Sequence, residues 1–383
     1  MRIAILSRNF DVRGGGAERY ACEIARHLAL RHEVHVFAQS FGETLPGVFY
    51  HPLSFSVRRP RWINQLGFAL ESWLRTRSGY DIVHAHENTW HGQIQTVHVM
   101  PVRFSLLSGR TGWQRYLRYL KVGLSPRISA YLWLEKCRFS LMPGRRVVAV
   151  SQSLSRNIEV AYPCLQRHVQ TITPGVDLPA EPSPAMQAAA RGHLRLPLKR
   201  RIALFVANDP RRKGLDFLLQ ALTLSSPDWC LAVVGESQQY PNYHQKALSM
   251  GLADRFFLLG SQKNMSEAYF AADILIHPTL EDTFAMVVLE AMAHRLPVMV
   301  SGPLHCGISE MLTHEKQALI LDDPTDPQAI AQGLMRLDDS AHLMDSIRTG
   351  GWIFAKQHAW SAVADAYDQL FQVCAKGDMK ATK

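Results

Sequence analysis

The chain has 383 residues, which is too long for one ordinary domain and suits two domains of about 190 residues each. Hydrophobic residues make up 47% of it and charged residues 20%, a balance that excludes the disordered and fibrous classes of protein. Lysine and arginine number 42 against 33 aspartates and glutamates, so the net charge is +9 and indicates an anionic partner. Nucleic acid, a phosphorylated ligand and a membrane surface all fit that charge.

Sequence signals of several other protein classes are absent. No apolar run reaches the length of about 18 residues that a membrane-spanning helix needs. The run at Ile3–Leu6 is short, which predicts a buried strand rather than a signal peptide. The six cysteines show no paired spacing, so neither a zinc site nor a disulfide framework is expected, and a cytosolic location fits. No Asp-x-Asp motif occurs, so a divalent metal has no obvious anchor.

Short apolar runs alternate with amphipathic stretches along the first half of the chain. Arg2–Ser7 is predicted to be a strand, and the glycines at 14–16 then open a helix over Ala17–Leu30. Further strands are expected at Glu33–Ala38, Asp81–His84, Gln95–His98 and Arg146–Val150. This alternation predicts a mostly parallel sheet with helices on both faces.

The proline-rich segment Thr173–Pro184 interrupts the alternation and is predicted to be a linker. The second half is expected to contain strands at Arg201–Ala207, Cys230–Val234, Phe256–Leu259, Ile274–His277 and Val298–Ser301, and helices at Leu215–Leu222, Asn264–Ala272 and Ala285–His294. The predicted fold class is α/β, with two doubly wound Rossmann-like domains that face each other across a cleft, the expected ligand site. The predicted domains are 1–176, 177–358 and a final helix at 359–383 that packs back on the first domain.

A loop with a possible binding role follows the first strand of each half: a glycine-rich loop in the first half and a basic loop in the second. In the first, Gly15 and Gly16 open a helix whose N-terminus favours an anion, although Arg19 replaces the third glycine of a dinucleotide fingerprint. An ordinary glycine turn is the alternative. In the second, Arg212 and Lys213 belong to a run of three cations that suits a diphosphate, and a solvated basic turn is the alternative.

The segment 276–292, IHPTLEDTFAMVVLEAM, is the most specific motif in the chain. It predicts a strand, a polar turn, and a helix from about Thr283 whose first amides are free to hold phosphate oxygens. Glu290 lies within the apolar part of that helix, where a carboxylate is costly unless it accepts hydrogen bonds. Glu290 either binds ribose hydroxyls, or it forms an i,i+4 pair with His294 or caps a neighbouring loop.

Together these segments resemble family 4 of the glycosyltransferases, which have the GT-B fold. The resemblance rests on the glycine loop and on Pro174–Asp177, Arg212–Gly214, Val234–Glu236, Ala272–Asp273, the Glu290 helix and the last helix from Trp360 to Phe371. Within the family the chain is most similar in look to bacterial lipopolysaccharide core glycosyltransferases. The resemblance implies transfer of a hexose-type sugar from a nucleotide-sugar, such as a UDP-sugar, with retention of configuration and no metal or other cofactor.

The resemblance also assigns roles to residues in the second half. Glu290 matches the family glutamate that binds the donor ribose, and Asp282, with Glu281 beside it, matches the one that contacts the donor sugar. Asp282 departs from the family pattern because its side chain is one methylene shorter. The amides of Thr283, Phe284 and Ala285 would hold the sugar or the diphosphate. Lys213 matches the family lysine, and Arg212 would replace the family arginine, because that position holds Asn208.

In the first half, His98 resembles the family histidine that points at the donor sugar, and it is favoured over His86. Gly15 and Gly16 would approach the donor diphosphate or the acceptor. Ten basic residues and only one acidic residue, Glu135, lie between 99 and 146, interleaved with aromatic residues. The basic residues are Arg103, Arg110, Arg115, Arg118, Lys121, Arg127, Lys136, Arg138, Arg145 and Arg146. This pattern favours contact with an anionic membrane, with single-stranded nucleic acid and a solvated surface as alternatives.

The expected function is therefore a hexosyltransferase acting at the inner face of the cytoplasmic membrane, as a cytoplasmic, peripheral protein. Its partners would be a nucleotide-sugar, a lipid-linked or core oligosaccharide acceptor and, through 103–146, the anionic membrane; no nucleic acid is expected. A sugar-nucleotide epimerase on the same scaffold and a basic nucleic-acid-binding protein are the alternatives.

Overall fold

The chain folds into two compact units in a computed structural model. The structure describes residues 1–381 except 13, 58, 109–112, 114–121 and 123–124. The first unit contains Met1–Gly175 and Trp360–Lys383, and the second contains Val176–Ala359. The predicted boundaries differ from these by one residue at each junction.

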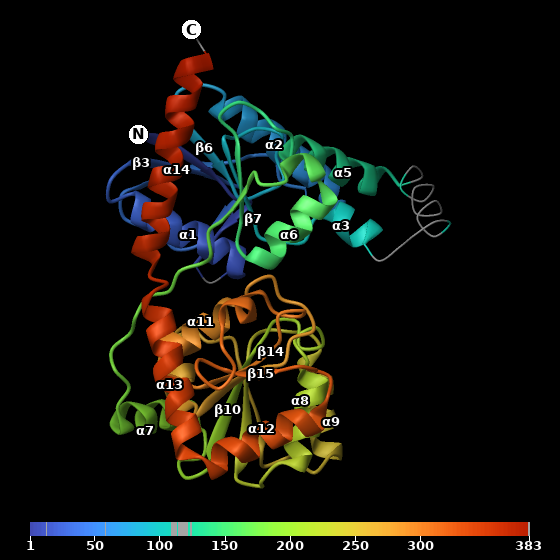
Figure 1. Ribbon diagram of the computed structural model, residues 1–383, viewed down its shortest axis with the longest axis vertical. Helices are drawn as coiled ribbons and strands as arrows, with labels where there is room; N and C mark the ends of the chain where they lie inside the picture. The colour runs from blue at the N-terminus through green and yellow to red at the C-terminus, as the bar shows by residue number, and fades with distance from the viewer. Residues whose placement is uncertain (13, 58, 109–112, 114–121, 123–124, 382–383) are drawn as a thin grey trace. The chain divides into compact units, whose positions relative to one another are not determined.

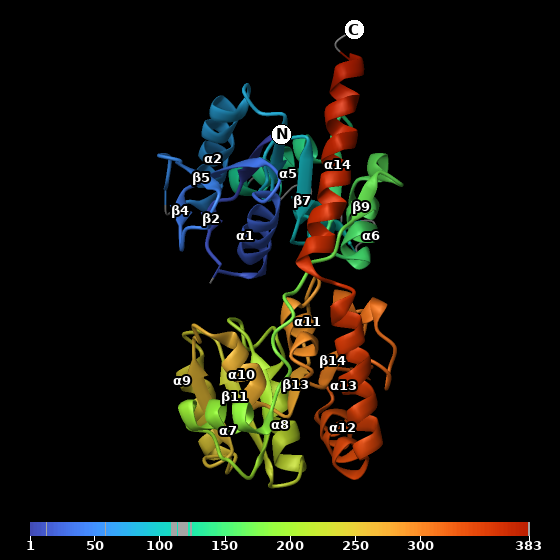
Figure 2. The ribbon, with the colours of Figure 1, turned by 90° about the vertical axis from the view of Figure 1, so that its left-hand side faces the viewer.

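The first unit is built on a parallel sheet with strand order β5–β3–β1–β6–β7–β8–β9, and β5 and β9 lie at its opposite edges (Figure 2). The strands are β1 (Arg2–Leu6), β3 (Glu33–Ala38), β5 (Val48–Pro52), β6 (Ile82–Ala85), β7 (Ile94–Val97), β8 (Arg146–Ala149) and β9 (Val169–Thr171), and β2 (Asn9–Phe10) pairs separately with β4 (Ser40–Phe41). The helices are α1 (Gly16–Leu28), α2 (Arg61–Thr76), α3 (Val102–Leu107), α5 (Pro126–Arg138), α6 (Gln152–Ala161) and α14 (Trp360–Ala381), with a short 3-10 turn η1 (Pro163–Leu165).

Both faces of this sheet are covered, because its strands are apolar on both sides. Ala4 and Leu6 of β1 pack with Phe68 of α2 on one face. On the first unit, α14 runs beside α1 and also contacts β6 (Figure 1). A Cβ atom at Gly175 would lie 2.8 Å from the Cα of Trp360, so glycine allows the two crossing segments to touch. The C-terminal helix is therefore part of the first unit's core.

The second unit has a parallel sheet with strand order β12–β11–β10–β13–β14–β15. Its strands are β10 (Arg201–Val206), β11 (Trp229–Val234), β12 (Phe256–Gly260), β13 (Ile274–His277), β14 (Val298–Ser301) and β15 (Leu319–Leu321). Its helices are α7 (Pro184–His193), α8 (Leu215–Leu224), α9 (Tyr240–Ser249), α10 (Met265–Ala271), α11 (Met286–Ala293), α12 (Pro327–Asp339) and α13 (Ala341–Lys356), with the 3-10 turn η2 (Gly307–Met311).

Alternate residues of each central strand of the second unit belong to two different hydrophobic cores. Ile202 and Leu204 of β10 pack with α10 and α11, whereas Ala203 and Phe205 pack with α8 and α12. In Figure 1, α11 and α8 lie on opposite sides of the strands of this sheet. The prediction of two doubly wound α/β units is confirmed.

The strand order reverses direction next to β1 in the first unit and next to β10 in the second. In open parallel sheets, ligands bind beyond the carboxyl ends of the strands at such a switch point. The loops after β1 and β6, and those after β10 and β13, are therefore where functional side chains are expected.

Candidate active site

Two glycines shape the loops at the switch point of the second unit. Gly214, at the start of α8, has φ +84°, and a Cβ atom there would lie 2.1 Å from the carbonyl oxygen of Pro278. Gly235, after β11, has φ +138°, and its Cβ atom would lie 1.8 Å from the carbonyl oxygen of Ala207. Other residues fit neither position, since each combines a left-handed conformation with close backbone approach. The loop carrying Lys213 is thereby held against the end of β13.

Lys213 and Asp282 form an ion pair across this switch point. The Nζ atom of Lys213 donates to Oδ2 of Asp282, and their side chains are only 14% and 17% exposed. Nε2 of His277, the last residue of β13, lies 3.3 Å from the same oxygen. Burial by itself would raise the pKa of Asp282, but the hydrogen bond from His277 and the Lys213 charge hold that pKa well below its usual range. Asp282 is therefore a carboxylate at all physiological pH values.

The other oxygen of Asp282 caps the turn before α11. Oδ1 accepts hydrogen bonds from the amides of Phe284 at 3.2 Å and Ala285 at 2.8 Å. The expectation that these two amides are free for a sugar or diphosphate is therefore wrong for this structure. Ala285 has φ +71°, so the helix begins at Met286 rather than near Thr283.

The structure also distinguishes Asp282 from its neighbour Glu281. The side chain of Glu281 is exposed, whereas Asp282 faces Lys213 and His277. Of the two predicted carboxylates, only Asp282 is built into the end of the sheet.

Glu290 is a buried carboxylate with a specific partner. Its exposed fraction is 6%, and Oε2 accepts a hydrogen bond from the hydroxyl of Tyr269 on α10 at 2.7 Å. His294 contacts the backbone carbonyl of Glu290 through Nδ1 at 2.7 Å, and its Nε2 lies 2.9 Å from the hydroxyl of Ser266. Arg212, by contrast, has a side chain 53% exposed beside Asp209, where it is accessible to an anionic ligand.

At the switch point of the first unit, Arg8 and Glu87 form an ion pair of 2.9 Å between the loops after β1 and β6. Gly15 is the N-cap of α1 and Gly16 its first residue, and both are exposed. A Cβ atom on Gly15 would lie 2.8 Å from Oε2 of Glu18. The start of α1 is thus exposed, with the carboxylate of Glu18 beside it, and anion binding there stays a prediction.

His98 lies directly after β7 and is hydrogen-bonded to His86, with 2.9 Å between Nε2 of His98 and Nδ1 of His86. The structure thus brings together the two histidines between which the sequence analysis chose. Burial, with a smaller contribution from the Arg138 charge, lowers the pKa of His98 to about 3. Burial and nearby charges also lower the pKa of His86. Both rings are therefore neutral at physiological pH.

Arg138 was expected on the basic outer surface, and the structure corrects this. Its exposed fraction is 3%, and its guanidinium donates to Oδ1 of Asn88 at 2.6 Å and to the carbonyl of Thr96 at 2.5 Å. Arg145 is half-buried and donates to the carbonyls of Cys137 and Trp90. These two cations support the end of β7 and the loop before it rather than the surface.

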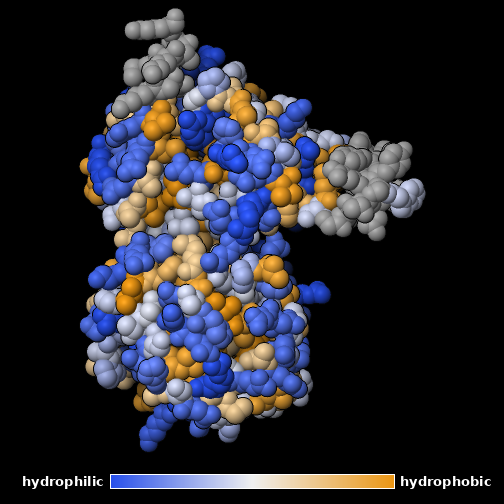
Figure 3. Space-filling model, viewed as in Figure 1, coloured by the Kyte–Doolittle hydropathy of each residue, from blue (hydrophilic) through white to orange (hydrophobic). Residues whose placement is uncertain are grey.

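The rest of the basic segment is divided between surface and undescribed residues. Arg127, Lys136 and Arg146 are exposed, and Arg103 lies 5.2 Å from the ring centre of Tyr162. The predicted cations Arg110, Arg115, Arg118 and Lys121 lie outside the described residues. Hydrophobic and hydrophilic residues lie side by side on the first unit near α3 and α5 (Figure 3). The exposed apolar side chains here include Trp133, Leu141 and Met142.

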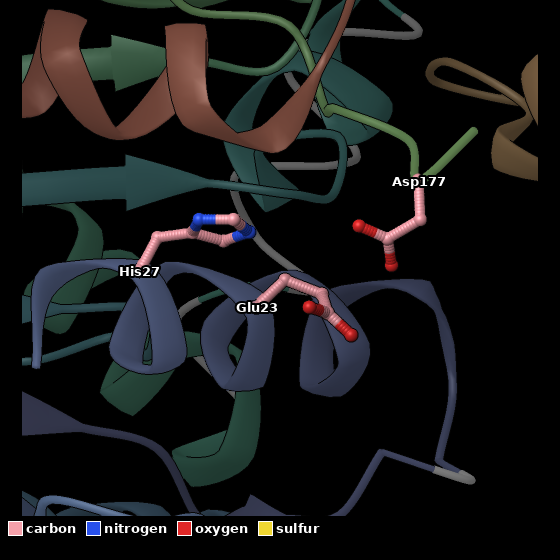
Figure 4. A group of neighbouring side chains, drawn as sticks. All are labelled: Glu23, His27 and Asp177. Atoms are coloured by element: carbon pink, nitrogen blue, oxygen red, sulfur yellow. The ribbon is translucent and has the colours of Figure 1, made fainter. Parts of the chain in front are cut away.

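Glu23 and His27 lie one turn apart on α1 (Figure 4). Such a pair can contribute two metal ligands, but Glu23 already pairs with Arg26 at 3.2 Å, and Asp177, also drawn there, belongs to the second unit. Two ligands do not define a metal site, so the expectation of metal-free catalysis stays a prediction. Within the described ranges, no helix is both long and apolar enough to cross a membrane.

Comparisons with known proteins match both units. Residues 14–179 match Glycosyltransferase Family 4, and residues 186–350 match Glycosyl transferases group 1. The chain belongs to these glycosyltransferases, which confirms the family that its motifs predicted. It is therefore an enzyme that transfers a sugar.

Solved structures confirm the GT-B fold. WaaG, a glycosyltransferase involved in lipopolysaccharide biosynthesis, superimposes with a TM-score of 0.82 at 17% identity, covering 96% of this chain and 99% of WaaG. Anabaena HepE, solved in complex with UDP and glucose, has a TM-score of 0.75 at 18% identity, covering 97% and 99%. The D-inositol 3-phosphate glycosyltransferase of Streptosporangium roseum is 26% identical over 91% of this chain and 86% of that protein.

Four residues of these sites were not singled out by the sequence analysis as functional. His277 and Tyr269 hold the two carboxylates, and Arg8 and Glu87 join the first unit's switch-point loops. Arg8 follows a predicted strand and His277 ends one, so their positions in the sequence could have indicated a functional role. Tyr269 had no such signal, because its contact with Glu290 joins two different helices.

Proposed function

We propose that this glycosyltransferase moves a hexose-type sugar from a nucleotide-sugar to a lipid-linked saccharide, such as lipopolysaccharide core, with retention of configuration and without a metal. The observation that carries the proposal is the Lys213–Asp282 pair at the switch point of the second unit, in the same unit as the buried Glu290. The second unit would hold the donor, and the first unit would hold the acceptor.

The cations of the second unit supply what a metal supplies in other transferases. The bond between the anomeric carbon and the phosphate oxygen breaks, and negative charge develops on the leaving nucleoside diphosphate. Lys213 and the exposed Arg212 stabilise that charge. The acceptor oxygen bonds to the anomeric carbon from the same face, and its proton passes to the leaving phosphate.

In this proposal Glu290 accepts hydrogen bonds from the donor ribose, while Tyr269 fixes one of its oxygens. His98 contacts the donor sugar as a neutral imidazole, because its pKa is lowered to about 3. A neutral ring can donate one hydrogen bond and accept another, which suits a sugar hydroxyl.

The acceptor is assigned to the first unit because of its basic and aromatic surface. Glu135, the one acidic residue between 99 and 146, is buried and accepts from the amides of Val102 and Arg103 and from the hydroxyl of Tyr162. Its charge is thus directed inward, so the charged side chains that the described part of this segment exposes are cations. An anionic lipid surface, or the phosphates of a lipid-linked acceptor, complements that charge.

Donor use is tested by thermal shift with a panel of nucleotide-sugars and by release of nucleoside diphosphate. We expect a nucleotide-sugar at 100 times its dissociation constant to add about 2.7 kcal/mol of stability. Glu290→Gln, which keeps an acceptor for Tyr269 but removes the charge, should lower donor affinity about tenfold without unfolding the protein. Conversion of the donor to its epimer without acceptor, or binding that tracks polynucleotide length and ignores nucleotide-sugars, would refute the proposal.

Membrane binding is tested by flotation of the full chain with vesicles that contain anionic lipid. Each basic residue near such a surface contributes about 1 kcal/mol, so reversing Arg127, Lys136 and Arg146 to glutamate should weaken partitioning by at least about 100-fold. The matched control reverses three exposed lysines of the second unit, Lys199, Lys263 and Lys316. Equal loss in both triple variants would show that only net charge matters and would refute the assignment to this segment.

A further inference from the structure

A continuous chain of hydrogen-bonding groups runs through the interior of the first unit. The hydroxyl of Tyr367 on α14 lies 2.9 Å from the hydroxyl of Tyr20 and 2.8 Å from that of Thr96. The Thr96 hydroxyl in turn lies 2.7 Å from Nε2 of His84, and Tyr20 donates to the carbonyl of Ile172 at 3.4 Å. The four side chains have no exposed surface. The C-terminal helix thus reaches a histidine of the central strand β6.

The Tyr20–Tyr367 and Tyr367–Thr96 contacts allow either hydroxyl to donate, and the carbonyl at one end of the chain favours one direction. A carbonyl only accepts, so when Tyr20 donates to Ile172 its single proton is used, and Tyr367 donates to Tyr20. Thr96 then donates to Tyr367, and the remaining donor to Thr96 is Nε2–H of His84. The Nδ1 atom of His84 is therefore unprotonated. In agreement, this buried atom has no hydrogen-bond partner among the described residues.

The two rings that the Tyr367 hydroxyl restrains flank the His86–His98 pair. The ring of His84 lies against that of His86, with 4.3 Å between their centroids. Tyr20 meets the ring of His98 edge-on, with a centroid distance of 5.0 Å. The hydroxyl of Tyr367 thus bonds Tyr20 directly and reaches His84 through Thr96, so it is linked to both rings that flank the histidine pair.

We infer that Tyr367 is a positioning residue for His98: it fixes the tautomer of His84 and the ring of Tyr20, and through them the histidine pair. The inference rests on the proposed role of His98 at the donor sugar. It assigns the C-terminal helix a part in catalysis beyond packing. Loss of the Tyr367 hydroxyl leaves Thr96 without its acceptor, so Thr96 can donate to Nε2 of His84 and the ring proton moves to Nδ1.

The test uses the full chain with 15N-labelled histidine. In the native protein the His84 ring should show the shifts of the Nε2–H tautomer, assigned by comparison with His84→Gln. In Tyr367→Phe the Nδ1–H form should rise to a detectable share. We also expect kcat to fall about tenfold with KM for the donor changed less than about twofold, because groups are misplaced rather than removed.

Tyr162→Phe is the matched control. It also removes a buried tyrosine hydroxyl from the first unit, one that donates to Glu135 at 3.0 Å. Both variants should lose some stability, but only Tyr367→Phe should change the His84 tautomer and kcat. An unchanged tautomer in Tyr367→Phe, or an equal fall of kcat in Tyr162→Phe, would overturn the inference. If His98→Ala keeps full activity, the proposed role of His98 is wrong, whereas the tautomer measurement still reports whether Tyr367 holds the cluster.

Discussion

Replacing Lys213 by methionine tests the ion pair at the switch point of the second unit. The substitution keeps the length of the side chain and removes its charge, which leaves the carboxylate of Asp282 largely buried. Removing one partner of a buried pair typically costs about 3–5 kcal/mol. Asp282 keeps two amide bonds and its contact with His277, so we expect the lower end, about 3 kcal/mol, in urea unfolding at pH 7.

The pH dependence of this loss has a definite sign. In the native protein the folded-state pKa of Asp282 lies below its ordinary value of 3.8, so the carboxylate contributes stability above about pH 4 and loses it as the pH falls through the folded value. Without Lys213, fewer interactions stabilise the charged carboxylate against the effect of burial, so the pKa of Asp282 rises. The folded variant then takes up a proton at higher pH than the native protein does. The stability gap between the two should therefore shrink as the pH falls from 7 toward 4.

Lys246→Met is the control, because Lys246 also pairs with an aspartate, Asp216, in the same unit. That pair is more exposed, at 39% and 32%, so its loss should cost less than about 1 kcal/mol. Adding Asp282→Asn to Lys213→Met should recover part of the loss, since the buried charge then disappears. If Lys213→Met loses no more stability than Lys246→Met, or if its loss does not vary with pH, then Lys213 and Asp282 do not act as a buried ion pair. Sugar transfer by Lys213→Met should fall roughly 100-fold.

Other predictions concern the loops and the histidines. Gly214→Ala should cost more than about 2 kcal/mol because its Cβ would meet Pro278, whereas Gly251→Ala, also at positive φ but with open space, should cost about 1 kcal/mol; urea unfolding compares them. The pH profile of kcat should show no ionisation of His98 between about pH 5 and 8, since its lowered pKa of about 3 keeps the ring neutral there. Arg138→Gln should destabilise the protein by about 2 kcal/mol without weakening vesicle flotation, because the guanidinium is buried.

The central strands were predictable because their burial on both faces requires continuous apolar runs between polar turns. The predictions at Glu33–Ala38, Ile274–His277 and Val298–Ser301 agree with the structure residue for residue. The edge strands Val48–Pro52 and Val169–Thr171 were missed because they are partly exposed and carry at most a short apolar stretch, which does not stand out from the surrounding loops.

The candidate site was predictable in position but not in contacts. Strand ends and the family pattern located Lys213, Asp282 and Glu290. The capping role of Asp282 depends on the left-handed backbone of Ala285, and nothing in the residue type of an alanine predicts that conformation. Arg138 was misplaced because a basic residue in a basic segment has the pattern of a surface. Its guanidinium is instead held by the carbonyl of Thr96 and the side chain of Asn88, both distant in the sequence.

If Lys213 binds the donor diphosphate as proposed, the carboxylate of Asp282 would couple donor binding to movement of Lys213. A carboxylate has about four lone-pair sites. In Asp282 they face the amides of Phe284 and Ala285, His277 and Lys213. No site remains for a sugar hydroxyl while Lys213 stays in place. If Lys213 turns to the diphosphate as proposed, Oδ2 becomes available at the moment the donor arrives, so phosphate and sugar recognition would be coupled through one oxygen. A donor lacking the diphosphate should then gain little from Asp282, and Asp282→Asn should weaken binding of the intact nucleotide-sugar more than that of the free sugar.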